Sequence, residues 1–191
     1  MHLFDAKKLD RLDDPIRAEH IPINKIAAEL CLKDGMALAD IGCGSGLFSY
    51  AFAEFIKPDG KLVGFDIQQA CIDHCEKKKD PNNKHVSFIL NSPDKINAKD
   101  DSFDSALMIL VAHELSEPGK FLNEVKRILK PGAKLALIEW QMAQTKNGPP
   151  LSERISPELL EKYLGNSGFS IIKNEPSGED HYFIVAEKQN K

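Results

Sequence analysis

Short apolar runs alternate along the chain with longer segments whose apolar residues recur at helical spacing. Seven runs predict strands, at residues 36–41, 61–67, 85–90, 103–110, 134–141, 169–173 and 182–187. Turn-forming clusters separate them, among them Asp34-Gly35 and Pro131-Gly132. Strands and helices in this alternation predict a mostly parallel sheet that helices cover on both faces.

The segments between the strands carry specific helix signals. Residues 121–129 repeat apolar side chains at the spacing of a helix that lies on a sheet. Ser156 and Pro157 predict a helix start, with the serine hydroxyl as N-cap and the proline in the first turn. Residues 23–30 predict an amphipathic helix ahead of the first strand.

The last two predicted strands have a different connection from the others. Only a short loop, residues 175–180, joins them, and a parallel crossover needs a dozen residues or more. We therefore expect an antiparallel hairpin at the end of the sheet.

The length of the chain, 191 residues, allows one domain with a full core and not two ordinary catalytic domains. We expect a single domain over residues 1–191, with its core in residues 22–187. Residues 1–21 are polar and broken at Asp13-Asp14-Pro15, which predicts an arm folded over the domain and able to act as a lid.

The charge balance narrows the range of partners. With 25 basic and 29 acidic side chains the net charge is -4, so no overall positive field would attract a nucleic acid. No apolar run approaches the roughly 20 residues of a membrane span, and the first residues lack the order of a signal peptide. We expect a cytoplasmic protein that binds neither nucleic acid nor membrane; its oligomeric state stays open.

One cluster invites comparison with a zinc site. Cys71, His74 and Cys75 share a face of a predicted helix, and thiolates with imidazole suit zinc. A closed zinc site takes four ligands, however, and no second Cys or His pair stands at a suitable spacing. We therefore expect no metal, and we expect the four cysteines to be reduced thiols.

A glycine-rich turn carries the strongest chemical signal. Glycines 42, 44 and 46 follow a predicted strand and open a predicted helix, so backbone N–H groups should face outward and a ligand can approach the chain. Asp66 ends the next strand about 20 residues later, where a ribose diol would lie. Together these features predict a nucleoside site.

Two details favour one kind of nucleoside. The third glycine of the dinucleotide fingerprint is replaced by Leu47, which argues against a nicotinamide-dependent oxidoreductase. Asp40 stands before the first glycine, where a carboxylate would repel a pyrophosphate and attract an ammonium group, directly or through water. The ligand that fits is an adenosine with a cationic amino-acid tail.

The stretch from Asp40 to Gly46, with Asp66, resembles the cofactor signature of class I S-adenosylmethionine-dependent methyltransferases. The chain is similar in particular to the small-molecule enzymes of type 11, through residues 113–118, 129–132, 148–150 and 155–158. The likeness covers residues 22–187. It implies an α/β fold, a doubly wound Rossmann-like sheet of seven strands in the order 3-2-1-4-5-7-6, with strand 7 antiparallel.

The resemblance also implies S-adenosylmethionine as cofactor and a set of residues that bind it. Asp40, Gly42 and Gly44 would contact the methionine moiety, Asp66 the ribose hydroxyls and Ile67 the adenine. Many relatives place an acid at the adenine amino group, where this chain has neutral residues. The expected cofactor-binding residues are Asp40, Gly42, Cys43, Gly44, Asp66, Ile67, Asn91, Ser92 and Leu110.

The catalytic candidates follow the fourth and fifth strands, since ligands of doubly wound sheets lie beyond the strand ends. His113 could accept a proton from the methyl acceptor, or only position ligands. Glu139 could orient His113, bind a cationic acceptor, or do neither. Arg154 could bind an anionic group of the acceptor or lie at the surface, and His20 could belong to the lid or the surface.

The expected reaction is an in-line transfer of the cofactor's methyl group to a small molecule. Enzymes that methylate the exocyclic amines of bases carry Asp or Asn, then Pro-Pro and an aromatic residue, after strand four. Here that place holds Leu110-Val111-Ala112-His113. A catalytically silent adenosylmethionine-binding or regulatory module is the alternative that the sequence leaves open.

Overall fold

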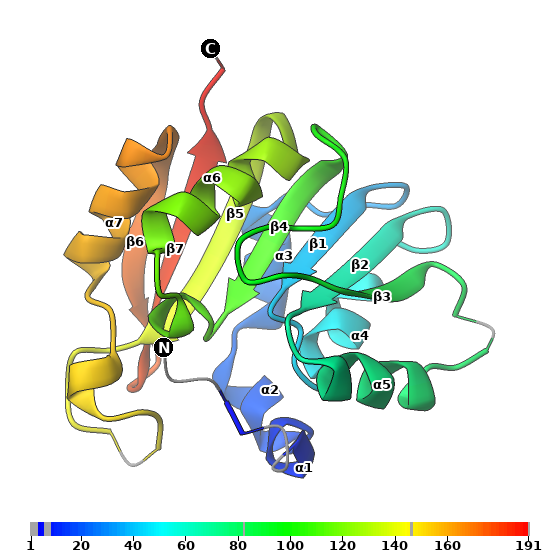
Figure 1. Ribbon diagram of the computed structural model, residues 1–191, viewed down its shortest axis with the longest axis horizontal. Coiled ribbons are helices and arrows are strands. Elements are labelled where there is room, and N and C mark those ends of the chain that lie inside the picture. The colour runs from blue at the N-terminus through cyan, green and yellow to red at the C-terminus, as the bar shows by residue number, and fades with distance from the viewer. Residues whose placement is uncertain (1–3, 6–8, 82, 146, 191) are drawn as a thin grey trace.

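A computed structural model describes residues 4–5, 9–81, 83–145 and 147–190, so part of the predicted arm lies outside the described residues. Its seven strands form one sheet in the order β3-β2-β1-β4-β5-β7-β6 (Figure 1). Neighbours among β1 to β5 are parallel, whereas β7 is antiparallel to both β5 and β6. The predicted strand order and C-terminal hairpin are confirmed. The strands are β1 (Ala37–Ile41), β2 (Lys61–Asp66), β3 (Val86–Leu90), β4 (Phe103–Ile109), β5 (Leu129–Trp140), β6 (Phe169–Ser177) and β7 (His181–Lys188).

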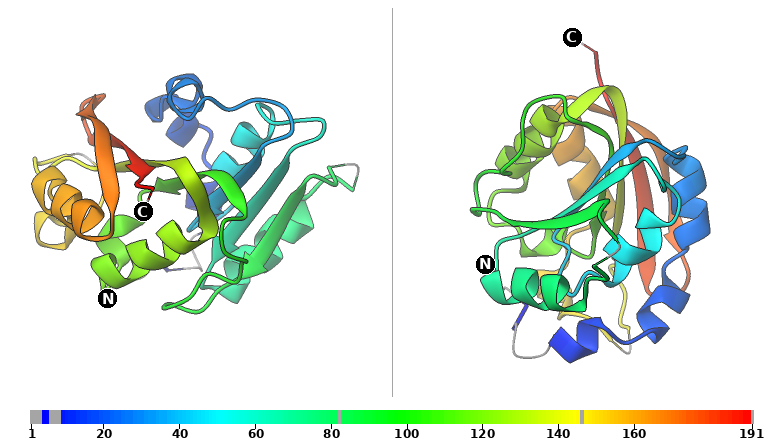
Figure 2. Two further views of the ribbon diagram at one scale, coloured as in Figure 1. Left: turned by 90° about the horizontal axis from the view of Figure 1, so that it is seen from above. Right: turned by 90° about the vertical axis from the view of Figure 1, so that its right-hand side faces the viewer.

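The helices lie on both faces of the sheet, with α6 and α7 on one side and α3 and α4 on the other (Figure 2). The α7 helix begins as predicted, since the Ser156 hydroxyl accepts a hydrogen bond from the backbone N–H of Leu159 at 3.3 Å. Of the described helices, none is long and apolar enough to cross a membrane. The helices are α1 (Leu9–Leu12), α2 (Ile16–His20), α3 (Ile23–Glu29), α4 (Leu47–Ala53), α5 (Gln69–Lys78), α6 (Pro118–Ile128) and α7 (Pro157–Asn166), with short 3-10 helices η2 (Ala112–Glu114) and η3 (Leu151–Glu153).

The sheet separates two apolar cores, which is why its central strands are apolar at nearly every position. Leu122 and Val125 of α6 belong to one core and Phe52 of α4 to the other, and all three are fully buried. Burying a side chain of this size contributes about 1.5 to 3 kcal/mol. The paired cores hold the carboxyl ends of β1, β2 and β4 at one rigid edge.

The start of β5 differs from the prediction. Pro131-Gly132 was expected to be a turn before a strand at 134, yet β5 already begins at Leu129. Phe103 pairs with Leu129 and Ser105 with Lys134, so the register advances two residues on β4 and five on β5. The positive φ of Gly132, 74°, fits such a bulge. The two residues therefore form an irregularity inside the strand.

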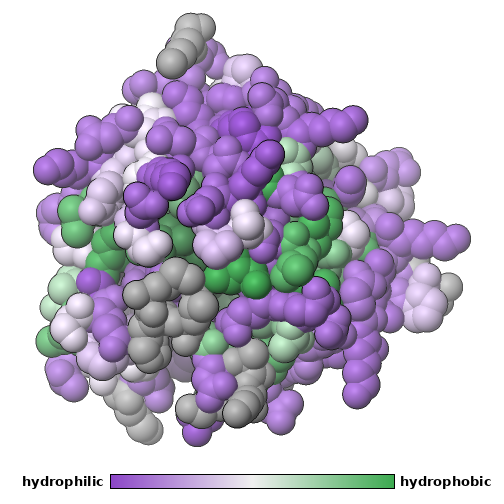
Figure 3. Space-filling view, in the orientation of Figure 1, coloured by the Kyte–Doolittle hydropathy of each residue, from purple (hydrophilic) through white to green (hydrophobic). Residues whose placement is uncertain are grey.

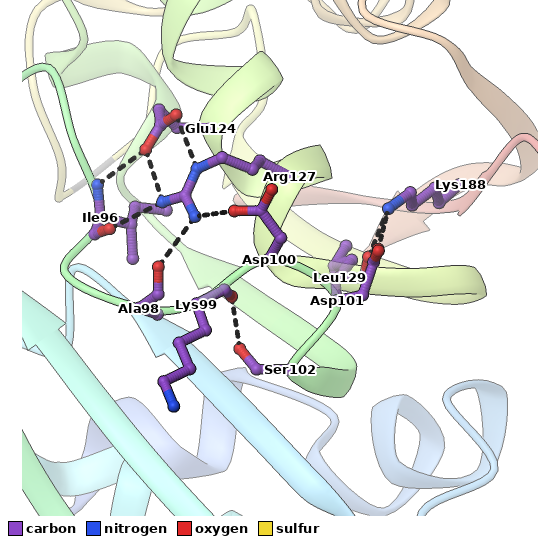
Figure 4. Close-up of polar contacts among 10 residues, drawn as sticks. All are labelled: Ile96, Ala98, Lys99, Asp100, Asp101, Ser102, Glu124, Arg127, Leu129 and Lys188. Carbon is purple, nitrogen blue, oxygen red and sulfur yellow. Dashed lines mark hydrogen bonds and ion pairs between the residues drawn. The ribbon is translucent and has the colours of Figure 1, made fainter.

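Arg127, near the end of α6, binds the irregular loop between β3 and β4 (Figure 4). Its Nη1 atom donates to the Ala98 carbonyl at 2.8 Å and to Asp100 at 2.7 Å, and its Nη2 donates to the Ile96 carbonyl at 2.8 Å. Glu124 accepts from Nε at 2.9 Å and from Nη2 at 2.8 Å, and its hydrogen bond is the main cause that raises the pKa of Arg127. One guanidinium thereby holds a loop that has little regular structure of its own.

Candidate active site

A cavity of about 1070 Å³ opens at the carboxyl edge of the sheet. The arrowheads of β1, β2 and β4 point to this edge, and α1 and α2 lie beside it (Figure 1). Residues of the glycine turn, of the strand ends and of the N-terminal arm all line the cavity. On the face shown in Figure 3, apolar side chains gather in a band across the middle, between polar surfaces above and below. The size and mixed lining suit an organic ligand.

The glycine turn forms one wall of this cavity. Gly42, Gly44 and Gly46 have φ of 73°, 54° and 78°, a left-handed conformation that side chains disfavour. A Cβ at Gly42 would also come within 2.4 Å of the Val111 side chain. Gly42 therefore needs to be glycine both for its backbone conformation and for the space around it.

Three backbone N–H groups of this turn bind to β2 and do not face outward as predicted. Those of Gly42 and Cys43 donate to the Phe65 carbonyl at 2.7 and 3.0 Å, and that of Gly44 donates to Asp66 at 3.0 Å. The end of β2 accepts all three hydrogen bonds because the turn closes directly over that strand. A ligand can therefore approach the backbone of the turn closely, while the hydrogen bonds of these amides hold the conformation of the turn.

Asp66 ends β2 and lines the cavity. Its Oδ2 accepts the Gly44 amide at 3.0 Å and its Oδ1 accepts the Gln68 amide at 2.9 Å. Burial raises the pKa of Asp66, and the two amide hydrogen bonds oppose that rise. Two donors fix the orientation of a carboxylate that has further lone pairs, an arrangement suited to a diol.

Asp40 lies behind the wall of the cavity. It is 2% exposed, and its carboxylate accepts a hydrogen bond from the Ser49 hydroxyl of α4. Burial raises the pKa of Asp40 to about 6, against the effect of Ser49 and with a further rise from the charge of Asp66. Within the described part of the chain, Asp40 is not among the lining residues. The structure joins Asp40 to α4, and its attraction for an ammonium group, directly or through water, stays a prediction.

The other predicted cofactor residues divide into two groups. Cys43, Ile67, Asn91 and Leu110 line the cavity. Ser92 is not among the described lining residues and forms an isolated bridge with Lys95. The Asn91 side chain also has an internal role, since its Oδ1 accepts the backbone N–H of Asn97 at 2.9 Å.

Leu110 follows β4 with a positive φ of 60°, which is rare for a branched side chain. Its N–H donates to the Ile138 carbonyl at 2.8 Å, so pairing with β5 holds this conformation. Strained residues of this kind cluster at functional sites. The sequence did not predict this conformation of Leu110, because the conformation depends on the pairing of β4 with β5.

His113 and Glu139 meet at the cavity. Nδ1 of His113, in η2, lies 2.8 Å from Oε2 of Glu139, near the end of β5. Glu139 is 1% exposed and stands behind His113, which lines the cavity. Burial lowers the pKa of His113, but the hydrogen bond and charge of Glu139 outweigh it, so the pKa is raised overall. Of the roles considered for Glu139, orienting His113 is the one this geometry fits.

The described part of the N-terminal arm is attached to the rest of the protein by polar contacts. Asp13 pairs with His74 at 2.6 Å and with Lys78, both on α5. The Arg17 guanidinium lies 5.4 Å from the centre of the Phe48 ring. Arg17 and His20 of the arm line the cavity. Part-exposed ion pairs contribute little to stability, so buried apolar residues such as Ile21 hold the arm more firmly than these contacts do.

Two residues beside Trp140, Arg154 and His181, differ from what the sequence indicated. Among the described residues, Arg154 is not part of the cavity lining. It donates to loop carbonyls of Pro149, Gln141 and Ala143 at 2.7 to 2.9 Å. It is therefore a loop organiser, and the anion-binding alternative is not favoured. His181, the first residue of β7, lines the cavity and went unnoticed in the sequence.

No group of three or more His, Cys, Asp or Glu residues in the described ranges is placed to hold a metal ion. Cys71 and Cys75 are buried, and His74 is engaged with Asp13 of the arm. The helix face considered for zinc thus contributes to packing and to the attachment of the arm.

Fold and cavity together define a class I methyltransferase. The chain belongs to the methyltransferase domain family of type 11, whose profile matches residues 39–137. A solved S-adenosylmethionine-dependent methyltransferase from Aquifex aeolicus is 32% identical with a TM-score of 0.92, over 97% of this chain and 99% of that one. S-adenosylmethionine is the cofactor that this family and this structure imply.

Curated relatives are more distant. A demethylmenaquinone methyltransferase of Lactobacillus johnsonii is 28% identical over 117 residues, which are 60% of this chain and 48% of that protein. The chain therefore spans about half the length of this relative. The solved [4+2]-cyclase SpnF shares the fold alone, with a TM-score of 0.79 and 19% identity over 92% of this chain and 82% of that one.

Proposed function

We propose that the protein transfers the methyl group of S-adenosylmethionine to a small molecule whose accepting atom carries an acidic hydrogen. His113 acts as the general base and Glu139 positions it. The observation that carries this proposal is the 2.8 Å contact between Nδ1 of His113 and the buried carboxylate of Glu139. General bases of this kind contribute about 10² to 10⁴-fold to a rate.

The contact determines which nitrogen of His113 reacts. A carboxylate only accepts hydrogen bonds, so Nδ1 carries the hydrogen and Nε2 of the neutral ring has the available lone pair. Nε2 takes the acceptor's proton as the acceptor's electron pair forms a bond to the methyl carbon. The electrons of the breaking carbon–sulfur bond remain on sulfur. Orientation of the two reactants supplies much of the remaining rate.

The cofactor is proposed to lie along the glycine turn. Asp66 would accept hydrogen bonds from the ribose, with Ile67 and Asn91 beside the adenine and Leu110 near the reacting end. All four line the cavity. Asp40 would act from behind the turn, by holding α4 through Ser49. The arm, as part of the same single domain, would cover the bound cofactor.

A small organic acceptor is supported by the comparisons and by the shape of the site. The relatives from Lactobacillus johnsonii and Staphylococcus aureus are named for demethylmenaquinone, which is their acceptor by name. The cavity is bounded on several sides, by the arm, the strand ends and residues 147–150. A long polymer would need an open groove, whereas this shape suits a compact molecule.

The first test compares ligands by titration calorimetry. We expect S-adenosylmethionine and its demethylated product to bind more tightly than NAD or NADP. Tighter binding of NAD would contradict the cofactor assignment.

The second test seeks the acceptor. Methyl-tritiated S-adenosylmethionine and a cell extract are incubated with the protein, and the label is followed into small molecules, nucleic acid and protein. Label in a small molecule, absent with the His113→Ala variant, supports the proposal. Tight cofactor binding without any transfer would support a catalytically silent module.

A further inference from the structure

His181 is a buried histidine that the proposed mechanism leaves without a role. It is 5% exposed and lines the cavity. Its Nε2 atom is buried and has no hydrogen-bond partner among the described residues. An unpaired buried polar atom costs about 1 to 3 kcal/mol, so native proteins rarely keep one without a function for it.

The surroundings of His181 form a rigid aromatic wall. His181 pairs with Trp140 in the β5–β7 register, and the two ring centres lie 4.5 Å apart at 46°. The Arg154 guanidinium lies 5.4 Å from the indole, and a Cβ at Gly148 would approach that ring to 2.7 Å. Contacts from three directions therefore fix the indole in place, and His181 packs against it.

This wall lies next to the proposed base. Trp140 follows Glu139 directly, and the backbone N–H of Trp140 donates at 3.3 Å to the same Glu139 carboxylate oxygen that His113 contacts. Both histidines line one cavity. A flat ligand lying against the wall would therefore have one end near His113 and a polar group near His181.

The imidazole of His181 offers a hydrogen bond in its uncharged form. Burial lowers the pKa of His181, and the positive charges of His20 and Arg17 act in the same direction. The carboxylates of Asp180 and Glu139 oppose that lowering without reversing it. A neutral imidazole carries one donor and one acceptor, which suits an uncharged oxygen substituent better than an anion.

We propose that His181 is a specificity-determining residue that hydrogen-bonds an uncharged oxygen substituent of a flat acceptor lying against Trp140. The inference rests on the proposed function, because it places the accepting atom of the same molecule at His113. Acceptors with a second oxygen opposite the reacting one would then be preferred over otherwise identical acceptors that lack it.

The test compares two probes that differ by one hydroxyl, 1,4-dihydroxynaphthalene and 1-naphthol, without oxygen and with S-adenosylhomocysteine bound. Affinity is measured by calorimetry. Trp140 is the only tryptophan of the chain, so quenching of its fluorescence reports whether the probe lies at this wall. We expect the wild type to bind the diol about tenfold more tightly, the effect of one well-placed hydrogen bond.

Two variants separate recognition from packing. His181→Phe keeps an aromatic ring against Trp140 and removes the nitrogen, so it should abolish the preference while its Tm stays equal or rises. His181→Gln keeps a donor and an acceptor, so it should retain part of the preference. Equal affinities of the wild type for the two probes, no binding of either, or an undiminished preference in His181→Phe would each overturn the inference.

Methyl transfer to both probes is measured separately, with labelled S-adenosylmethionine. A diol that binds in a His181-dependent manner and is methylated supports both proposals. Binding with this dependence but without transfer contradicts the proposed function alone. Transfer with no dependence on His181 contradicts the present inference alone.

Discussion

Nδ1 of His113, just after β4, lies 2.8 Å from Oε2 of Glu139, near the end of β5. Backbone N–H groups of His113 and Trp140 also donate to this carboxylate, each at 3.3 Å. Three contacts therefore fix Glu139, and Glu139 in turn fixes the rotation of the imidazole. The pair is oriented by the fold before any acceptor binds, which lowers the cost of reaching the reactive arrangement.

Replacing His113 by alanine should lower kcat by about 10² to 10⁴-fold, because the lost proton acceptor acts in the transition state. Affinity for S-adenosylmethionine should stay close to that of the wild type. Labelled methyl transfer and calorimetry measure the two quantities. His85→Ala, at the opposite end of the sheet just before β3, is the matched control and should be fully active. A fully active His113→Ala variant would show that the base lies elsewhere or is unnecessary.

Glu139→Gln keeps the shape of the side chain and removes its charge. In the wild type Glu139 raises the pKa of His113 above 6.5 against the effect of burial, so the acidic limb of the rate profile should lie above pH 6.5. In the variant only the charges of Glu114 and Glu153 still oppose burial, so the limb should move to lower pH, with a lower kcat on the plateau. The kcat/KM profile from pH 5 to 9 measures this shift. A lower plateau with an unmoved limb would assign Glu139 a purely structural role.

Asp66→Asn removes the charge from the proposed ribose contact and retains one acceptor oxygen, whereas Asp66→Ala removes both. A hydrogen bond to a charged group contributes about 1.5 to 3 kcal/mol, so the alanine variant should bind S-adenosylmethionine at least about tenfold more weakly. The asparagine variant should lie between it and the wild type. Asp73→Asn, on the exposed side of α5, controls for a general loss of charge. Unchanged calorimetric affinity in a folded Asp66→Ala protein would remove Asp66 from the site.

Asp40→Asn should change the dependence of stability on pH. The pKa of Asp40, about 6 in the folded protein, exceeds its ordinary value of 3.8, so folding favours the protonated form. The contribution of Asp40 to the free energy of unfolding is therefore fully present below pH 3.8 and is lost as the pH rises through 6. Asparagine cannot ionise, so at pH 8 the variant should be more stable, on the order of 3 kcal/mol. The difference in free energy of unfolding between variant and wild type should become small at pH 4. Urea unfolding at pH 4 and pH 8 measures this difference, and a difference that does not change with pH would contradict this account.

The sheet could be predicted because its signals are local. Glycine and proline clusters separated the strands, and the short loop before β7 excluded a parallel crossover. The start of β5 could not be predicted in this way. Pro131-Gly132 normally ends an element, and only the pairing of Phe103 with Leu129 shows that the strand runs through it.

The site was predictable where residues lie next to one another in sequence, as in the glycine turn. His181 had no local signal, because its place in the cavity follows from its pairing with Trp140, 41 positions earlier in the chain. Arg154 was ambiguous because its partners are backbone carbonyls, which no residue pattern reveals. The placement of Asp40 depended in the same way on the packing of Ser49 beneath the turn.

The antiparallel direction of β7 has a consequence for how such a protein can diverge. Because β7 runs against β5, its first residue arrives at the edge where β5 ends, and one hairpin turn brings a late part of the chain to the active site. The proposed cofactor contacts all precede residue 111, whereas Trp140, Gly148 and His181 all follow residue 139. Substitutions in the last third of the chain can therefore change the acceptor-binding residues and leave the proposed cofactor-binding residues unchanged. A descendant could acquire a new acceptor in a few steps, each of which keeps the methyl donor bound.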